Sequence, residues 1–154
     1  MNATHFYDVN LTWEKDRKGV ISSPVLTSSI EVVTPPEFPK GIEGLWSPEH
    51  LFVGAVNSCL MTTFLAIAEN SHLEFVAFES NAIGKLEMVD GKYMISEVVL
   101  KPILTIKDES SKEKALRVLS KSESACLISN SIKSTIIFEP QIIIESILVE
   151  NLAL

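Results

Sequence analysis

The sequence predicts an α+β fold in which a largely antiparallel sheet surrounds a long buried central helix. Residues 47–72, SPEHLFVGAVNSCLMTTFLAIAENSH, form an almost wholly apolar run long enough for such a helix. Strand-like runs lie on both sides of it, and a shorter amphipathic helix follows them. The expected order is β-β-α-β-β-α-β, in a single domain over residues 1–154.

The elements before the central helix are two strands and an irregular loop. Residues 5–13 alternate polar and apolar side chains, and the polar WEKDRKG that follows is typical of a turn. A second strand is expected over residues 20–33. Residues 34–46 contain three prolines and two glycines, which favour a loop that shapes a pocket mouth.

The central helix carries a clear start signal. Ser47 is a good N-cap, Pro48 suits the first helical position, and Glu49 complements the helix dipole. Apolar residues then cover most of its circumference, so we expect protein to enclose it on nearly all sides.

Two more strands, a helix and a final strand follow. Residues 74–89 and 92–106 flank Asp90-Gly91, a dipeptide favoured in two-residue hairpin turns. Ser110 or Ser111 is expected to cap a surface helix. Residues 134–149 form a β-branched run in which Pro140 indicates an edge or a bulge.

Charge and composition exclude several classes of protein. The net charge is −7, and Arg17 and Arg117 are the two arginines, so neither nucleic acid nor an anionic membrane is an expected partner. Neither a secretion signal nor a membrane span is evident, and a cytoplasmic location is expected.

Two cysteines, Cys59 on the central helix and Cys126 after the second, carry the candidate chemistry. Their separation of 67 positions is too long for a CxxC pair or a compact zinc site, and the three histidines have no ligand-like spacing to them. No metal and no cofactor is therefore expected. His50 and His72 lie two to three helical turns from Cys59, so a Cys-His hydrolase lacks a base. Redox chemistry remains, in which one thiol attacks and the other condenses with its sulfenic acid.

The stretch SPEHLFVGAVNSCL, together with the later ESACLISNSIK, resembles the OsmC/Ohr family of organic hydroperoxide reductases. The order of strands and helices matches along nearly the whole chain. The resemblance implies that Cys59 is the peroxidatic cysteine and Cys126 the resolving one. It also implies an intertwined homodimer, an organic hydroperoxide substrate and an external dithiol reductant.

The resemblance further implies that Glu49 orients an arginine that lowers the pKa of Cys59. Arg17 matches the position of that arginine in the Ohr branch, whereas the OsmC branch has it just before the helix, where this chain has Lys40. The alternative interpretation of Arg17 is a turn residue exposed to solvent. The chain also departs from its relatives at Leu127, where many have proline.

Helix geometry predicts where Glu49 acts. Ten residues of α-helix span about 15 Å, so Glu49 cannot contact Cys59 of its own subunit. Two such helices packed antiparallel about a two-fold axis would place Glu49 of one chain beside Cys59 of the other. We therefore expect an obligate homodimer with two composite sites.

The leading hypothesis is a thiol peroxidase with Cys59, Cys126, Glu49 and Arg17 as its site residues. Leu60, Phe52 and Trp46 would favour an apolar peroxide over hydrogen peroxide. Two alternatives remain open at this point. One is a non-catalytic small-molecule binding module, and the other is a thiol-disulfide oxidoreductase or redox sensor that uses the same cysteines.

Overall fold

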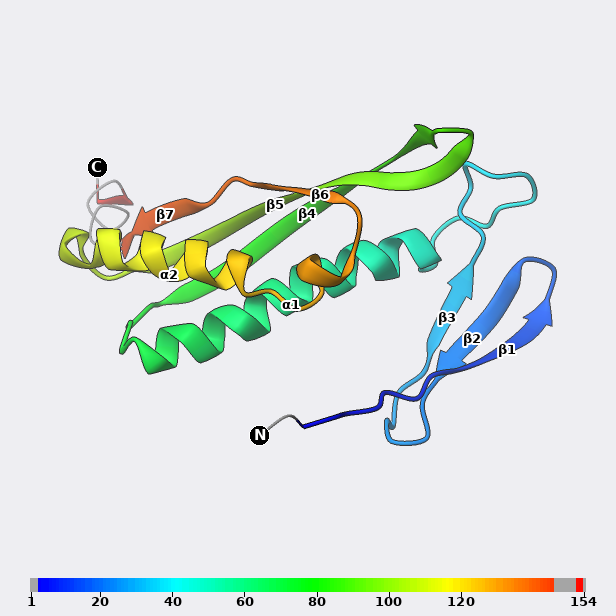
Figure 1. Cartoon of the computed structure of the whole chain (residues 1–154), viewed down its shortest axis with the longest axis horizontal. Helices are drawn as coiled ribbons and strands as arrows, with labels where there is room; N and C mark the ends of the chain where they lie inside the picture. Colours follow the sequence, from blue (N-terminus) through cyan, green and yellow to red (C-terminus); the bar gives the residue numbers. More distant parts are fainter. Residues whose placement is uncertain (1–2, 146–151, 154) are drawn as a thin grey trace. The chain divides into compact units, whose positions relative to one another are not determined.

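A computed structural model describes residues 3–145, 152 and 153 of the chain. The chain forms two compact units, residues 1–51 and residues 52–154. The prediction of one domain over residues 1–154 remains a prediction. Figure 1 shows the elements of each unit.

The first unit contains a three-stranded antiparallel sheet in the order β1 (Asn10–Lys15), β2 (Lys18–Ser22) and β3 (Ile30–Val33). The strand predicted over residues 20–33 is therefore two strands. Pro24, which has no N–H for a strand ladder, lies in the turn between them, where the N–H of Leu26 donates to the carbonyl of Ser23 at 3.2 Å. The turn between β1 and β2 contains Arg17, as predicted.

Helix α1 spans Pro48–Asn70, and its start follows the prediction. The Oγ of Ser47 accepts a hydrogen bond from the backbone N–H of His50 at 3.2 Å, as an N-cap should. The Oγ also lies 2.7 Å from Nδ1 of His50. By length and composition α1 also suffices to cross a membrane, which the sequence reasoning did not recognise, although core helices of soluble proteins share these properties.

The second unit is built on a long hairpin. Strands β4 (Ala77–Val89) and β5 (Lys92–Ile106) pair antiparallel, and Val89 pairs with Lys92 across Asp90-Gly91. Asp90 and Gly91 have φ angles of 48° and 77°, which confirms the two-residue turn.

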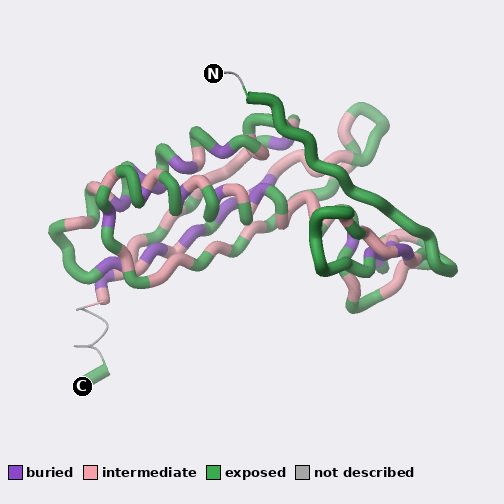
Figure 2. Tube along the Cα trace, turned by 90° about the horizontal axis from the view of Figure 1, so that it is seen from below, coloured by how far each residue is buried: buried purple, intermediate pink, exposed green. Residues whose placement is uncertain are grey.

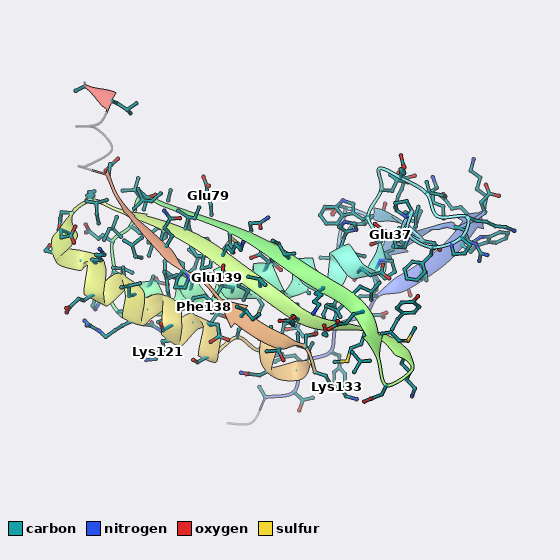
Figure 3. All side chains as sticks on the ribbon, turned by 90° about the horizontal axis from the view of Figure 1, so that it is seen from above. Glu37, Glu79, Lys121, Lys133, Phe138 and Glu139 are labelled. Atoms are coloured by element: carbon teal, nitrogen blue, oxygen red, sulfur yellow. The ribbon has the colours of Figure 1, made fainter. Side chains whose placement is uncertain are left out.

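Two short strands complete the sheet, and both run parallel to β5. Strand β6 (Thr135–Phe138) pairs with residues 97–100, and β7 (Gln141–Ile144) pairs with residues 103–106. Pro140 lies in the break between them, so the single last strand of the prediction is two. Phe138 packs into the core, whereas Glu139 is 3.9 Å from Lys101 in an exposed ion pair (Figure 3). The rest of the predicted last strand, residues 146–149, lies outside the described residues.

The second helix, α2 (Lys112–Ser124), follows a short 3-10 turn, Glu109–Ser111. Ser111 occupies the N-cap position of α2 but makes no side-chain cap hydrogen bond. Asp108 instead caps the preceding turn through the N–H of Ser110 at 3.0 Å. The sequence therefore predicted the position of the helix but not the residue that caps it.

Both helices pack on one face of the β4–β7 sheet, where two clusters of buried residues form the core. One cluster joins α1, α2, β5 and β7, and it includes Phe64, Leu104 and Leu119. The other consists of Val56, Leu60, Val98 and Leu100. Buried positions recur along both helices between exposed ones (Figure 2).

Burial of α1 by its own chain is confined to one stripe. Its buried residues recur every four positions: Val56, Leu60, Phe64 and Ala68. Met61 and Leu65 are 40% and 43% exposed, although both are apolar. The α+β fold with two helices is confirmed, but the described chain does not by itself enclose α1 on nearly all sides.

Candidate active site

Cys59 lies near the middle of α1 and is partly exposed. Its Sγ is 3.9 Å from the Oγ1 of Thr63, one helical turn later on the same face. The next residue, Leu60, is fully buried in the core. Core packing of the adjacent residue therefore fixes the helix that carries the thiol.

Cys126 follows the end of α2 and is fully buried. It begins a tight turn, residues 126–131, which the N–H of Asn130 closes by donating to the carbonyl of Cys126 at 3.0 Å. The side chain of Ile128, in the same turn, packs against the core cluster of Val56 and Leu60. This contact holds the turn against α1, and it brings the two cysteines together.

Both cysteines are free thiols in this structure. Burial raises the pKa of the Cys59 thiol, but hydrogen bonds to its sulfur outweigh that effect and the net pKa lies below its ordinary value. The donors are the backbone N–H groups of Ile128 and Leu127, the thiol of Cys126 and the hydroxyl of Thr63. Cys59 is thus the thiol that ionises more readily.

The pKa of Cys126 moves in the opposite direction. Burial raises the pKa of this thiol, Ser129 opposes the rise, and the adjacent sulfur of Cys59 adds to it. A buried Cys126 that keeps its proton can donate a hydrogen bond to the sulfur of Cys59. The pair therefore combines a thiol of lowered pKa with a thiol of raised pKa, and of the two Cys59 more readily forms the nucleophilic thiolate.

The other two predicted site residues, Arg17 and Glu49, line one cavity of about 600 Å³ in the first unit. Strand β3, the loop after it and the start of α1 form its walls. The Oε2 of Glu49 is buried and has no hydrogen-bond partner among the described residues. No ion pair of Arg17 is found within the part of the chain that the structure describes. Lys40, the alternative to Arg17, is exposed and does not line this cavity.

His50 and His72 make other contacts and are not placed to act as a base for Cys59. His50 bonds to the N-cap Ser47, and its ring packs edge-on against Trp46 with centroids 6.2 Å apart. The backbone carbonyl of His72 accepts a hydrogen bond from Lys114 at 3.0 Å. Among the residues with described positions, no group of three His, Cys, Asp or Glu side chains could hold a metal ion.

Comparison with known proteins decides the family. The sequence model of the OsmC-like protein family matches residues 41–141, which include Glu49 and both cysteines. The chain belongs to the OsmC-like family. The uncharacterised protein YmaD of Bacillus subtilis is 27% identical over 139 residues, covering 87% of this chain and 91% of that protein.

Solved structures share the OsmC-like fold. An OsmC-like protein of unknown function from Vibrio cholerae superposes with a TM-score of 0.78 at 23% identity, covering 89% of this chain and 99% of that one. An organic hydroperoxide resistance protein from Elizabethkingia anophelis superposes with a TM-score of 0.71 at 18% identity. The match covers 93% of this chain and 100% of that one. At these identities the likeness establishes the fold.

Sequence reasoning missed several groups around Cys59 in this OsmC-like chain. Thr63 could have been found, because the residue at i+4 lies above Cys59 on a helix. The N–H groups of Leu127 and Ile128 could not, because every residue except proline carries one. Their action depends on where the turn lies, which the sequence pattern does not specify.

Proposed function

We propose that this protein is a thiol peroxidase that reduces organic hydroperoxides to alcohols. The observation that carries the proposal is the contact between Cys59, whose pKa is lowered, and Cys126, whose pKa is raised. A binding module has no need for two thiols of opposite character in contact. Membership of the OsmC-like family, in which some structural relatives are organic hydroperoxide resistance proteins, supports the same reaction class.

The reaction proceeds in three balanced steps. The Cys59 thiolate attacks one peroxide oxygen, so an S–O bond forms, the O–O bond breaks, and the alkoxide leaves as an alcohol after taking a proton. The Cys126 sulfur then attacks the sulfenic acid of Cys59, which forms a disulfide and releases water. An external dithiol reduces that disulfide by exchange and is itself oxidised to a disulfide.

In this proposal, Arg17 and Glu49 of a second copy of the chain complete the site around Cys59. Glu49 precedes Cys59 by ten residues of the same helix, a rise of about 15 Å, so it acts on the thiol of a partner subunit. Arg17 and Glu49 share one cavity, and the buried Oε2 of Glu49 has no hydrogen-bond partner among the described residues, which supports a site that takes a group from a second chain. The guanidinium would favour the thiolate further.

Substrate preference follows from the apolar surroundings of the thiols. Phe52 packs against the core cluster that contains Leu60, the residue next to Cys59, and an apolar side chain there favours an organic peroxide. Leu60 was also expected to favour an apolar peroxide. That prediction is wrong, because the Leu60 side chain is fully buried in the core. A cytoplasmic location, where dithiol reductants are available, fits the reaction.

Mass spectrometry of the protein after one equivalent of cumene hydroperoxide tests the proposal. We expect a disulfide between Cys59 and Cys126, with one equivalent of peroxide consumed. The Cys59→Ser variant should consume none, whereas Cys126→Ser should still reduce the first equivalent and stop at the sulfenic acid of Cys59. Unchanged thiols in the wild-type protein would refute the peroxidase. Oxidation by glutathione disulfide without any reaction with peroxide would support a thiol-disulfide exchange protein instead.

A further inference from the structure

Three cations of α2 line one surface cavity of about 350 Å³ beside the end of α1. Lys114, Arg117 and Lys121 are spaced by three and four residues, so they lie on one side of the helix. Val118 and Ser71, the residue that follows α1, complete the lining. Among the described residues no carboxylate lines this cavity, although the chain has 20 acidic side chains and 13 basic ones.

The three cations keep hydrogen-bond donors for a ligand. The ammonium of Lys114 donates to the carbonyl of His72 at 3.0 Å, and an ammonium has three donors in all. Arg117 pairs with Glu113 at 3.8 Å, but both side chains are highly exposed, so the pair contributes little and the guanidinium can bind an anion as well. Lys121 has no ion pair within the part of the chain that the structure describes.

Stabilisation of the helix ends does not account for all three cations. Lys121 lies in the last turn of α2, where a cation favours the negative end of the helix dipole. Lys114 binds a carbonyl just beyond the end of α1 and acts in the same way there. Arg117 is in the middle of α2 and serves neither end, yet it lines the same cavity. The shared cavity therefore points to a ligand of negative charge.

The size and the charge of the cavity indicate which anion it takes. A volume of about 350 Å³ suits a small molecule, since pockets of that kind span roughly 300–1,000 Å³. A nucleic acid would extend beyond the three cations onto the surface of a chain whose net charge is −7. For a small anion that repulsion is screened beyond about 8 Å at physiological ionic strength. A phosphate group, with up to two charges and three acceptor oxygens, matches three cations better than a carboxylate does.

We propose that this cavity binds a small molecule that carries a phosphate group, held by Lys114, Arg117 and Lys121. Neither cysteine lines the cavity, so the site is separate from the proposed peroxidase chemistry and does not depend on it. Lys114 already joins α2 to the segment after α1. A ligand bound between these two elements binds the folded chain alone and therefore stabilises it.

An NMR titration of the whole chain with inorganic phosphate tests the site, with sodium chloride added to keep the ionic strength constant. We expect saturable shifts of the backbone amides of the residues that line the cavity. A parallel titration with glycerol 3-phosphate distinguishes the two sources of a phosphate group. Tighter binding of the ester assigns a phosphorylated organic molecule, and equal or weaker binding assigns free phosphate. Shifts that are absent, or that sodium chloride alone reproduces, would overturn the inference.

Two matched variants test which cations bind the phosphate. Lys121→Gln removes an exposed cation of the cavity, and Lys133→Gln removes an exposed cation that lies before β6 and outside the cavity (Figure 3). We expect Lys121→Gln to weaken phosphate binding about fivefold, because one exposed charge contact is lost, and Lys133→Gln to bind as the wild type does. Equal losses in both variants would overturn the inference. Peroxide reduction should be unchanged in Lys121→Gln, so the phosphate site and the peroxidase can fail separately.

Discussion

At the scale of single residues, Cys59 and Cys126 differ in their surroundings and not in their chemistry. Cys59 is partly exposed and receives hydrogen bonds on its sulfur, whereas Cys126 is fully buried and donates one. The first situation favours the thiolate and the second favours the thiol. The proposed roles, Cys59 as nucleophile and Cys126 as resolving cysteine, follow from this contrast.

The contrast predicts selective alkylation. A thiol of lowered pKa is ionised at a lower pH, so Cys59 should react with iodoacetamide below the pH at which a free cysteine does. Cys126, of raised pKa, should react only at higher pH or after unfolding. Peptide mass spectrometry of the native protein over a pH series checks both statements. Preferential labelling of Cys126 would reverse the assigned roles.

The residue scale also shows which parts of the site the sequence could predict. The two cysteines were recognisable because a thiol is chemically distinctive and each lies in a motif that resembles a known family. Their contact depends on Ile128 packing against the core cluster that contains Leu60, and a spacing of 67 positions does not specify that packing. The backbone N–H groups that lower the pKa of Cys59 have no sequence signal, because every residue except proline carries one.

At the scale of elements, the fold was predictable where local chemistry decides it. Asp90-Gly91 specified its turn, because both positions adopt positive φ, and Ser47-Pro48 specified the start of α1. The parallel pairing of β6 and β7 with β5 was not predictable, since it depends on which strand lies at the sheet edge after α2. Pro24 and Pro140 each divide one predicted strand, and the sequence reasoning weighed only the second.

The packing of α1 on β4 depends on a glycine, which gives a prediction for this scale. A Cβ at Gly84 would overlap the Cγ2 of Val53, a β-branched side chain with little freedom to move. Gly84→Ala should therefore lower the free energy of unfolding by about 1–3 kcal/mol, measured by urea denaturation.

A double-mutant cycle separates this contact from other effects of the added methyl. Val53→Ala removes the overlapping atom, so the loss caused by Gly84→Ala should be much smaller in the Val53→Ala background. Additive effects of the two substitutions would contradict the contact. Because Val53 lies on the helix that carries Cys59, restored packing should also keep the Cys59 alkylation midpoint of the wild type.

At the scale of the whole molecule, apolar side chains that the described chain leaves uncovered support the proposed homodimer. Trp13 is 72% exposed, and Met61 and Leu65 lie on the face of α1 that the chain leaves open. A second copy of α1 packed on that face would complete the enclosure expected from the sequence. The same copy would bring Glu49 to a thiol that it cannot reach within one helix.

Complementation between inactive variants tests that arrangement. Chains with Cys59→Ser keep Arg17, and chains with Arg17→Ala keep Cys59, so each alone should have little peroxidase activity. If sites form between subunits, unfolding and refolding a one-to-one mixture gives heterodimers with one intact site and one doubly altered site. Random assembly makes about half of the dimers mixed, which predicts recovery of roughly a quarter of the wild-type rate. A refolded wild-type sample sets the reference for recovery. A mixture no more active than its components would place Arg17 in the same subunit as the thiol it serves, or outside the site altogether.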